Sequence, residues 1–193
     1  MNAAVPTYTS YEDYLALEDA RRDDDVKHEW CDGAVYSMSR GTPEHGTLTN
    51  KIAFLLTGGL LGRCRGFSSD TMIFVERAKL STYADVSFVC GEVEQKTVIK
   101  KNGVSLGVAI TNPTVIVEVL SDSTERYDRD GKFNAYKLLP SLEEYVLVSQ
   151  HEPSVEVYRR DSSGVWTIVE TAKAGGSVTV RGAELAVDDV YAA

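Results

Sequence analysis

The chain has 193 residues, of which 43% are hydrophobic and 25% are charged, and its net charge is -9. This length and apolar content predict one domain, residues 1–193, with its own core. The acidic balance argues against a broad electrostatic grip on nucleic acid, because non-specific affinity depends on Lys and Arg neutralising phosphates. We also expect no signal peptide or membrane span, since the longest apolar stretch, Ile52 to Leu61, is interrupted by a threonine and two glycines.

The cysteines and histidines suggest no metal or disulfide framework. Cys31, Cys64 and Cys90 are odd in number, widely spaced and not arranged as C-x-x-C. The three histidines are equally scattered, and none forms an H-x-x-x-H pair. We therefore expect no disulfide, no zinc site and a reducing, cytoplasmic location.

The N-terminal part predicts a helix, a hairpin and a second helix. Capping signals and helical spacing place the first helix from about Ser10 to Ala20. The segment His28 to Met38 contains two short strand-like runs around Asp32-Gly33, a dipeptide typical of a type I′ turn. A cap followed by proline, Thr42-Pro43, begins the second helix, which ends near Gly58-Gly59.

The rest of the chain predicts strands interrupted by one helix. Three central strands are expected at Thr71 to Glu76, Ala84 to Cys90 and Thr114 to Leu120. The third is almost continuously apolar, which is typical of a strand covered on both faces. A helical segment follows from Asp128 to Leu139, and the tail from Thr171 on is expected to wrap the edge of the domain. Later strands are expected at Glu144 to Ser149, Val155 to Arg160, Val165 to Glu170 and Val178 to Val180.

Glu118 is the only charge in its apolar strand, and burial of a carboxylate is costly unless it is protonated, paired or bound to metal. With period two, Glu118 shares a face with Ile116 and Leu120, and Asp85 lies near the start of another apolar strand. For either acid alone, the simpler interpretation is an end-of-strand carboxylate that reaches solvent or pairs with arginine. That interpretation suits Asp85, near the start of its strand, better than Glu118, which has apolar residues on both sides. If the two strands are adjacent, the two carboxylates can lie close together.

Lys132 is the third candidate. At helical spacing it shares a stripe with Ala135, Tyr136 and Leu139, which places it on the side of the helix that faces the sheet. Two simpler alternatives remain: a pair with Asp128 one turn earlier, or an aliphatic stem that lies over the core while the amine reaches water.

The order of these residues resembles the Uma family of predicted bacterial restriction endonucleases, within the PD-(D/E)XK nuclease superfamily. The resemblance runs from about Tyr11 to Arg160 and is densest from Asn112 to Tyr136. The residues that carry it are Glu29, Asp85, Asn112-Pro113, Val117-Glu118-Val119-Leu120-Ser121, Ser123-Thr124, Asp128, Lys132 and Tyr136.

The resemblance implies an α/β (α+β) fold: a restriction-endonuclease-like mixed β-sheet core flanked by helices, with an N-terminal helix and hairpin and a C-terminal β extension. It implies that Glu29, Asp85 and Glu118 bind Mg²⁺ or Mn²⁺, and that Asp85, Glu118 and Lys132 are catalytic. The lysine usually stands two residues after the second acid, where this chain has Leu120. Lys132 of the following helix takes its place.

Further positions match the family or depart from it. Ala84 and Asp122 replace two common prolines, and Asp122 adds a charge near the site. His45 matches a family histidine, for which we favour local capping or packing over a phosphate contact or proton transfer. Ser121 is interpreted as a turn or cap residue rather than a nucleophile, since no histidine stands beside it in sequence. The remaining accessory candidates are Asp128 and Tyr136.

The implied activity is metal-dependent hydrolysis of phosphodiester bonds in nucleic acid, expected to be DNA, with a homodimer expected by analogy. One alternative is a catalytically silent module of the same fold that acts in binding or regulation. A second is an interaction protein with a metal-free network of Asp85, Glu118 and Lys132. A nuclease needs basic residues near its site to bind a backbone phosphate. The candidates are Arg63, Arg65, Lys96, Lys100 and Lys101, and the silent module is favoured if they lie far from Glu118.

Overall fold

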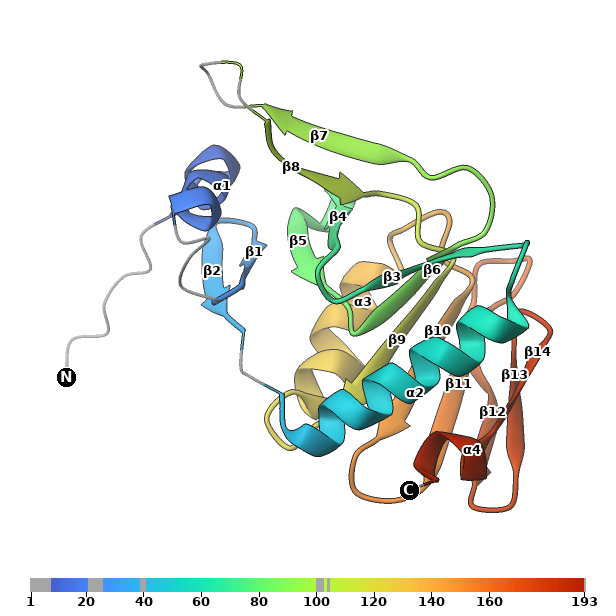
Figure 1. Cartoon of the computed structure of the whole chain (residues 1–193). Coiled ribbons are helices and arrows are strands. Elements are labelled where there is room, and N and C mark those ends of the chain that lie inside the picture. Colours follow the sequence, from blue (N-terminus) through green and yellow to red (C-terminus); the bar gives the residue numbers. More distant parts are fainter. Residues whose placement is uncertain (1–7, 21–25, 39–40, 100–102, 104, 193) are drawn as a thin grey trace.

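The computed structural model describes residues 8–20, 26–38, 41–99, 103 and 105–192, and Figure 1 shows their arrangement. Two six-stranded mixed sheets form most of the molecule. The first sheet has the order β2 (Ala34–Ser37), β1 (His28–Cys31), β5 (Leu80–Tyr83), β4 (Met72–Val75), β8 (Ser105–Ile110) and β7 (Gln95–Ile99). A 3-10 turn, η2 (Glu76–Ala78), joins β4 to β5.

Helix α1 (Tyr11–Ala20) packs against this first sheet through aromatic side chains. Tyr14 is fully buried beside Trp30 of β1 and Phe74 of β4. The hairpin β1–β2 turns at Asp32 and Gly33, both with positive φ angles of 42° and 93°. The helix and hairpin predicted from the sequence are therefore confirmed, including the turn chemistry.

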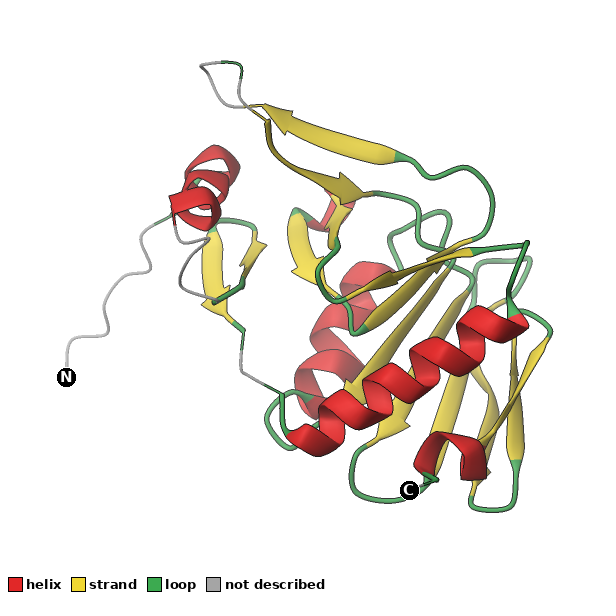
Figure 2. Ribbon diagram, viewed as in Figure 1, coloured by secondary structure: helices red, strands yellow, loops and turns green. Residues whose placement is uncertain are grey.

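The second sheet contains the longest strands. Its order is β12 (Trp166–Lys173), β11 (Ser154–Arg160), β10 (Glu144–Ser149), β9 (Val115–Leu120), β6 (Val86–Val89) and β3 (Arg65–Ser68). Only the pair β9–β10 is parallel. Helix α2 (Pro43–Gly59) covers one face, and the helical segment formed by η3 (Tyr127–Lys132) and α3 (Phe133–Tyr136) covers the other (Figures 1 and 2).

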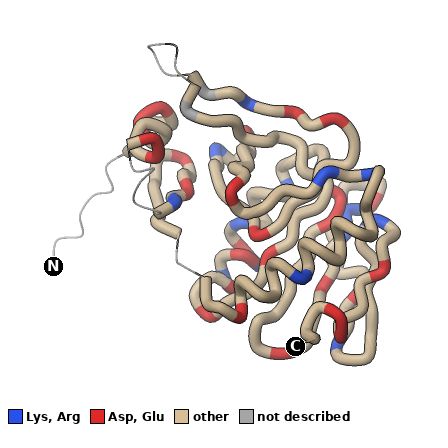
Figure 3. Tube along the Cα trace, in the orientation of Figure 1, with Lys and Arg blue, Asp and Glu red and all other residues tan. Residues whose placement is uncertain are grey.

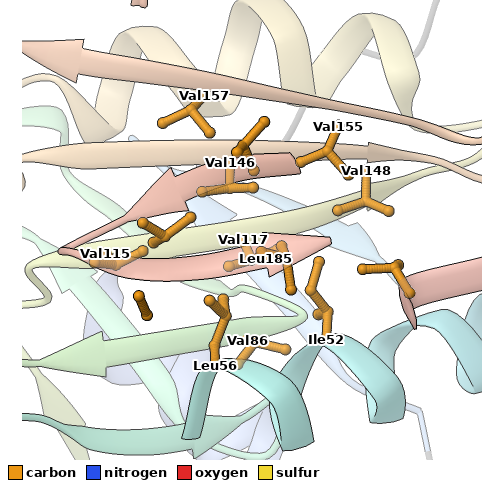
Figure 4. Close-up of a cluster of buried hydrophobic side chains, with 14 of the residues drawn as sticks. Ile52, Leu56, Val86, Val115, Val117, Val146, Val148, Val155, Val157 and Leu185 are labelled. Carbon is orange, nitrogen blue, oxygen red and sulfur yellow. The ribbon is translucent and has the colours of Figure 1, made fainter. Parts of the chain in front are cut away.

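The core between α2 and the second sheet fixes how β9 is oriented. Ile52 and Leu56 of α2 pack on Val86 of β6 and on Val115 and Val117 of β9, as Figure 4 shows. The alternate residues of β9 therefore face the η3–α3 side, where Ile116 and Leu120 join the second core cluster. Glu118 shares that face, as the period of two predicted.

The segment expected to be one α-helix from Asp128 to Leu139 is different in the structure. Glu125 and Arg126 are α-helical, a turn of π-helix follows at Tyr127–Lys132, and α-helix resumes only at Phe133–Tyr136 before the chain turns. Apolar spacing does not separate the two helix types, because both place residues three and four apart on nearby parts of the surface. Short π-helical turns are frequent at functional sites.

The C-terminal tail corrects a second expectation. It forms a separate hairpin, β13 (Ser177–Val180) and β14 (Ala183–Ala186), and a short helix, α4 (Val187–Tyr191). Val178, Leu185 and Val190 are buried in the same core cluster as α2, so the tail contributes to the core rather than only wrapping an edge. Strands β3, β5, β7, β8 and β14 were not anticipated from the sequence.

Cys64 and Cys90 form a disulfide, which contradicts the expectation that no cysteine is paired. The two residues lie one position beyond the Arg65–Val89 pair of β3 and β6. Nothing in the sequence indicated this proximity, because the two cysteines are 26 residues apart and strands β4 and β5 lie between β3 and β6 in the chain. Cys31 is the free cysteine. Within the described residues, no helix is both long and apolar enough to cross a lipid bilayer.

Candidate active site

A pocket of about 520 Å³ lies where β1, β2, β5, β9, the start of α2 and η3 meet. Four acidic side chains line it: Glu29, Asp85, Glu118 and Asp128. The other lining residues are Cys31, Tyr36, Ser37, Met38, Gly41, Thr42, His45, Tyr83, Val119, Ser121, Ser123, Thr124, Tyr127 and Lys132. The fold thus brings together residues that are distant in sequence, and every candidate site residue except Tyr136 lines the pocket. Tyr136 does not line it but contacts Glu118.

Asp85 and Glu118 lie side by side at the junction of β6 and β9. The antiparallel register pairs Val86 with Val117, which leaves Asp85 just before β6 and next to Glu118. The Asp85 amide donates to Glu118 Oε2 at 3.2 Å, and the Val119 amide donates to Asp85 Oδ2 at 2.7 Å. These reciprocal bonds hold both carboxylates at one end of the strand pair.

Lys132 reaches the same cluster from η3. Its Nζ donates to Glu118 Oε1 at 3.3 Å and to the Tyr83 carbonyl oxygen at 3.2 Å. It also lies 3.3 Å from Glu29 Oε1 and 3.6 Å from Asp128 Oδ1. The lysine is buried, so the alternative in which its amine reaches water is excluded, whereas the pair with Asp128 is present within the larger cluster.

Glu29 joins the site from the first sheet. It accepts a hydrogen bond from the hydroxyl of Thr82, on the neighbouring strand β5, in addition to the contact with Lys132. Thr82 was missed at the sequence level because the four-residue strand Leu80–Tyr83 was not predicted. Its β-branched and aromatic composition was the available signal.

His45 takes part in the cap of α2, as expected, and its imidazole also contacts the acidic cluster. Thr42 Oγ1 accepts from the His45 backbone amide, which is the expected cap of α2. The imidazole, however, contacts Asp85, with His45 Nε2 3.2 Å from Asp85 Oδ2. The hydrogen bond to Asp85 raises the pKa of His45 against the opposite effect of its partial burial.

The other accessory candidates support the cluster in different ways. Tyr136 donates its hydroxyl to Glu118 Oε1 at 3.0 Å from beneath the pocket. Asp128 is buried, and its Oδ1 has no hydrogen-bond donor among the described residues. Ser121 lies within hydrogen-bond distance of the hydroxyls of Ser123 and Thr124, an arrangement typical of the turn residue it was interpreted to be.

Burial and the close spacing of the charged groups shift the pKa values of the acids and the lysine in this pocket. Burial raises the pKa of Glu118 well above its ordinary value, although the Lys132 ammonium opposes this. Burial likewise raises the pKa of Asp128. For Lys132, burial alone would lower the pKa, but the surrounding carboxylates outweigh it and hold the pKa well above its usual value. The lysine stays charged, and protons compete with any cation for the carboxyl groups of Glu118 and Asp128.

A family model places this geometry in context. The model of Uma2, described as "putative restriction endonuclease", matches residues 11–188. The chain belongs to the Uma2 family. The match continues beyond Arg160, where the sequence resemblance was expected to end, and so takes in the hairpin β13–β14.

Two relatives and one solved structure agree with this membership. The Uma2 chain is 34% identical over 185 residues to the uncharacterized protein slr1290 of Synechocystis sp., covering 94% of this chain and 90% of the relative. It is 28% identical over 159 residues to the uncharacterized protein sll1609 of the same organism, covering 82% and 84%. A crystal structure of a "putative nuclease belonging to DUF820" from Anabaena variabilis superposes with a TM-score of 0.60 at 17% identity, covering 85% and 89% of the two chains. The restriction-endonuclease-like fold is thereby confirmed.

The donor chemistry of this Uma2 pocket fits a hard divalent cation. Carboxylate oxygens are the ligands that Mg²⁺ and Mn²⁺ prefer, and four carboxyl groups surround a single lysine. The buried Asp128 Oδ1 accepts no hydrogen bond among the described residues, which leaves this oxygen able to bind a ligand. In the conformation described, no three His, Cys, Asp or Glu side chains among the described residues are grouped as a metal site. Lys132 instead lies between Glu29 and Glu118.

The basic residues named from the sequence do not surround this Uma2 pocket. Arg63, Arg65 and Lys96 are absent from its lining, and Lys96 lies on β7 of the first sheet, over the Phe74 ring. Lys100 and Lys101 lie outside the described residues. Figure 3 shows Lys and Arg interspersed with acidic residues along the described chain rather than gathered along one element.

Proposed function

We propose that this Uma2 protein is a Mg²⁺- or Mn²⁺-dependent endonuclease that hydrolyses phosphodiester bonds of nucleic acid, with DNA as the expected substrate. The observation that carries the proposal is the convergence of Asp85, Glu118 and Lys132 in one pocket. Membership of a family described as "putative restriction endonuclease" supports it.

Asp85 and Glu118 would hold the cation, with Glu29 as the third oxygen donor. A bound Mg²⁺ or Mn²⁺ supplies a Lewis acid for the phosphate and a water of lowered pKa. Asp85 is held for this role by the Val119 amide, and Glu118 by the Asp85 amide and the Tyr136 hydroxyl. These fixed donors leave the carboxylates little freedom to turn away.

Lys132 would stabilise negative charge that develops on the phosphate oxygens. Its ammonium is already in the pocket and is kept charged by the carboxylates around it. A buried, preoriented cation is more effective than one in water, because no solvent has to reorganise during the reaction. The Tyr83 carbonyl oxygen and Asp128 fix the direction from which the ammonium acts.

The direct test is hydrolysis of plasmid DNA and of labelled oligonucleotides by purified protein with Mg²⁺, Mn²⁺ or EDTA. We expect cleavage only with metal, and a loss on the order of a hundredfold or more in Asp85→Asn and in Glu118→Gln. Glu184→Gln, an exposed acid of β14, is the control and should cleave like the wild type. Cleavage that persists in Asp85→Asn and Glu118→Gln would come from a contaminant and contradict the proposal.

A second candidate function is favoured by the charge of the pocket. Lys132 is the only Lys or Arg among the described lining residues, and the chain carries a net charge of -9. Both facts support a catalytically silent module that binds metal or a partner. Calorimetric titration with Mn²⁺ together with the cleavage assay separates the two: metal binding without cleavage of any substrate supports the silent module.

The homodimer expected by analogy is part of the same proposal. Light scattering after gel filtration tests it directly. A dimeric mass supports the expected homodimer, and a monomeric mass contradicts it.

A further inference from the structure

The acidic cluster lies deep in its pocket. The side chains of Glu118 and Lys132 are 3% and 8% exposed, and those of Asp85 and His45 are each 18% exposed. A phosphodiester must enter this pocket of about 520 Å³ to reach the carboxylates. A flexible single strand bends into a recessed site more readily than a stiff duplex does.

Two tyrosines stand at this pocket with their rings partly in solvent. Tyr36 is 56% exposed and Tyr127 is 38% exposed, although both are large side chains beside a buried site. Tyr36 is paired with Glu29 across the β1–β2 hairpin, so the two side chains lie on the same face of the hairpin. Tyr127 is the neighbour of Asp128, and its ring lies so close to Gly131 that a Cβ there would meet it at 2.5 Å. Both rings thus lie beside residues of the acidic cluster.

The charge of the lining makes these rings important for binding. Among the lining residues that the structure describes, four acids and one buried lysine provide no groove of Lys or Arg along which a phosphate backbone could run. Affinity for a strand must therefore come largely from contacts other than phosphate neutralisation. Stacking of bases on aromatic rings is the sequence-tolerant contact available to single strands, and a paired base offers no free face for it.

We propose that the pocket takes a single-stranded segment of nucleic acid, with unpaired bases stacked on Tyr36 and Tyr127 and the adjoining phosphate directed to Asp85, Glu118 and Lys132. This inference rests on the proposed nuclease function and specifies the substrate class. DNA and RNA strands share the chemistry, and separate arms of the test distinguish them.

The test measures binding apart from cleavage, by fluorescence anisotropy of a labelled oligonucleotide with the Glu118→Gln protein in Mg²⁺. Single-stranded DNA, single-stranded RNA and a blunt duplex of the same length are compared. In the same background, Tyr36→Ala and Tyr127→Ala remove the rings, whereas Tyr36→Phe and Tyr127→Phe keep them. Phe54→Ala is the matched control, because Phe54 is an aromatic side chain of α2 with 79% exposure that does not line the pocket.

We expect at least one single strand to bind roughly tenfold or more tightly than the duplex, and each alanine variant to weaken that binding roughly fivefold or more. The phenylalanine variants should bind within about twofold of the parent, since the ring is retained. The logarithm of affinity should fall with the logarithm of salt concentration with a slope shallower than about -2, as expected for few phosphate contacts. Circular dichroism shows whether each variant is folded.

The inference is overturned if the duplex binds as tightly as both single strands, if the alanine variants match Phe54→Ala, or if no strand binds. Wild-type cleavage separates this failure from failure of the proposed function. Metal-dependent cutting of duplex that is insensitive to Tyr36 and Tyr127 rejects the single-strand inference and keeps the nuclease. Tyrosine-dependent binding of single strands without metal-dependent cutting keeps the inference and rejects the nuclease.

Discussion

Lys132 Nζ lies 3.3 Å from Glu118 Oε1, and the same nitrogen lies 3.3 Å from Glu29 Oε1. Glu118 belongs to β9 of one sheet and Glu29 to β1 of the other, so one lysine joins acids from both sheets. These contacts are buried, so removal of the lysine would leave the charges of Glu29 and Glu118 uncompensated. The site is therefore coupled to how the two sheets are held together.

Lys132→Met should destabilise the protein by about 3 kcal/mol or more at neutral pH, because it leaves the carboxylates of Glu118, Glu29 and Asp128 facing one another. The loss should shrink as the pH falls, since those groups then take up protons. Urea unfolding followed by circular dichroism measures it. Lys173→Met, which removes only an exposed pair with Glu152, should cost no more than about 1 kcal/mol. Equal losses in the two variants would contradict the importance assigned to the cluster.

Mn²⁺ should stabilise the wild type but not Asp85→Asn or Glu118→Gln. At about a hundred times the dissociation constant, the gain is about 3 kcal/mol, or roughly 6–10 °C in Tm for a chain of this size. Because burial raises the pKa of Glu118 and of Asp128, protons compete with the cation for these groups, and the shift should grow as the pH rises. Differential scanning fluorimetry records it. The control Glu184→Gln should retain the full shift. A shift of the same size in Asp85→Asn and Glu118→Gln would mean that the metal binds elsewhere.

His45→Ala should reduce the stability of the metal-free protein in a pH-dependent way. The hydrogen bond to Asp85 raises the pKa of His45 in the folded protein above its ordinary value of 6.5. The folded state then binds the proton more tightly than the unfolded state, so this stabilisation is fully present below 6.5 and disappears as the pH rises through the folded pKa. Unfolding free energies of wild type and variant should therefore differ most in acid solution. A constant difference across this range would indicate a packing role alone, and His151→Ala controls for loss of an exposed histidine.

Removing the Cys64–Cys90 disulfide should lower the free energy of unfolding by about 3.5 kcal/mol, the value expected for a sequence separation of 26 residues. Reduction of the wild type and the double substitution Cys64→Ser, Cys90→Ser should have the same effect on the urea midpoint. Cys31→Ser changes a free cysteine and serves as the control. A wild-type midpoint that does not respond to reductant would show that this pair contributes no stability.

Much of the local structure was predictable, because each signal lies within a few residues. Asp32-Gly33 supplies the two positive φ angles of its turn, and Thr42-Pro43 supplies a cap and a first helical residue. The strands that escaped prediction are mostly short. β3 and β5 have only four residues each, too few for alternation of apolar and polar side chains to be recognised.

The site was predictable as a set of residues but not as an arrangement. The period of β9 places Glu118 on the side of Ile116 and Leu120, and helical spacing turns Lys132 inward; both are properties of one segment. The contacts of Glu29 with Thr82, of His45 with Asp85, and of Lys132 with acids of two sheets depend on strand register and on how the sheets pack.

The sequence alone therefore determined the helix and hairpin at the N-terminus, the face on which Glu118 lies and the acids and lysine that form the cluster. Tertiary structure decided that the tail joins the core, that Cys64 meets Cys90, and that Tyr36 and Tyr127 stand at the pocket of Glu118. The physical reason is the range of the interactions. Turn geometry and side-chain periodicity act within a few residues, whereas pairing between strands far apart in the chain is fixed only when the whole core is packed.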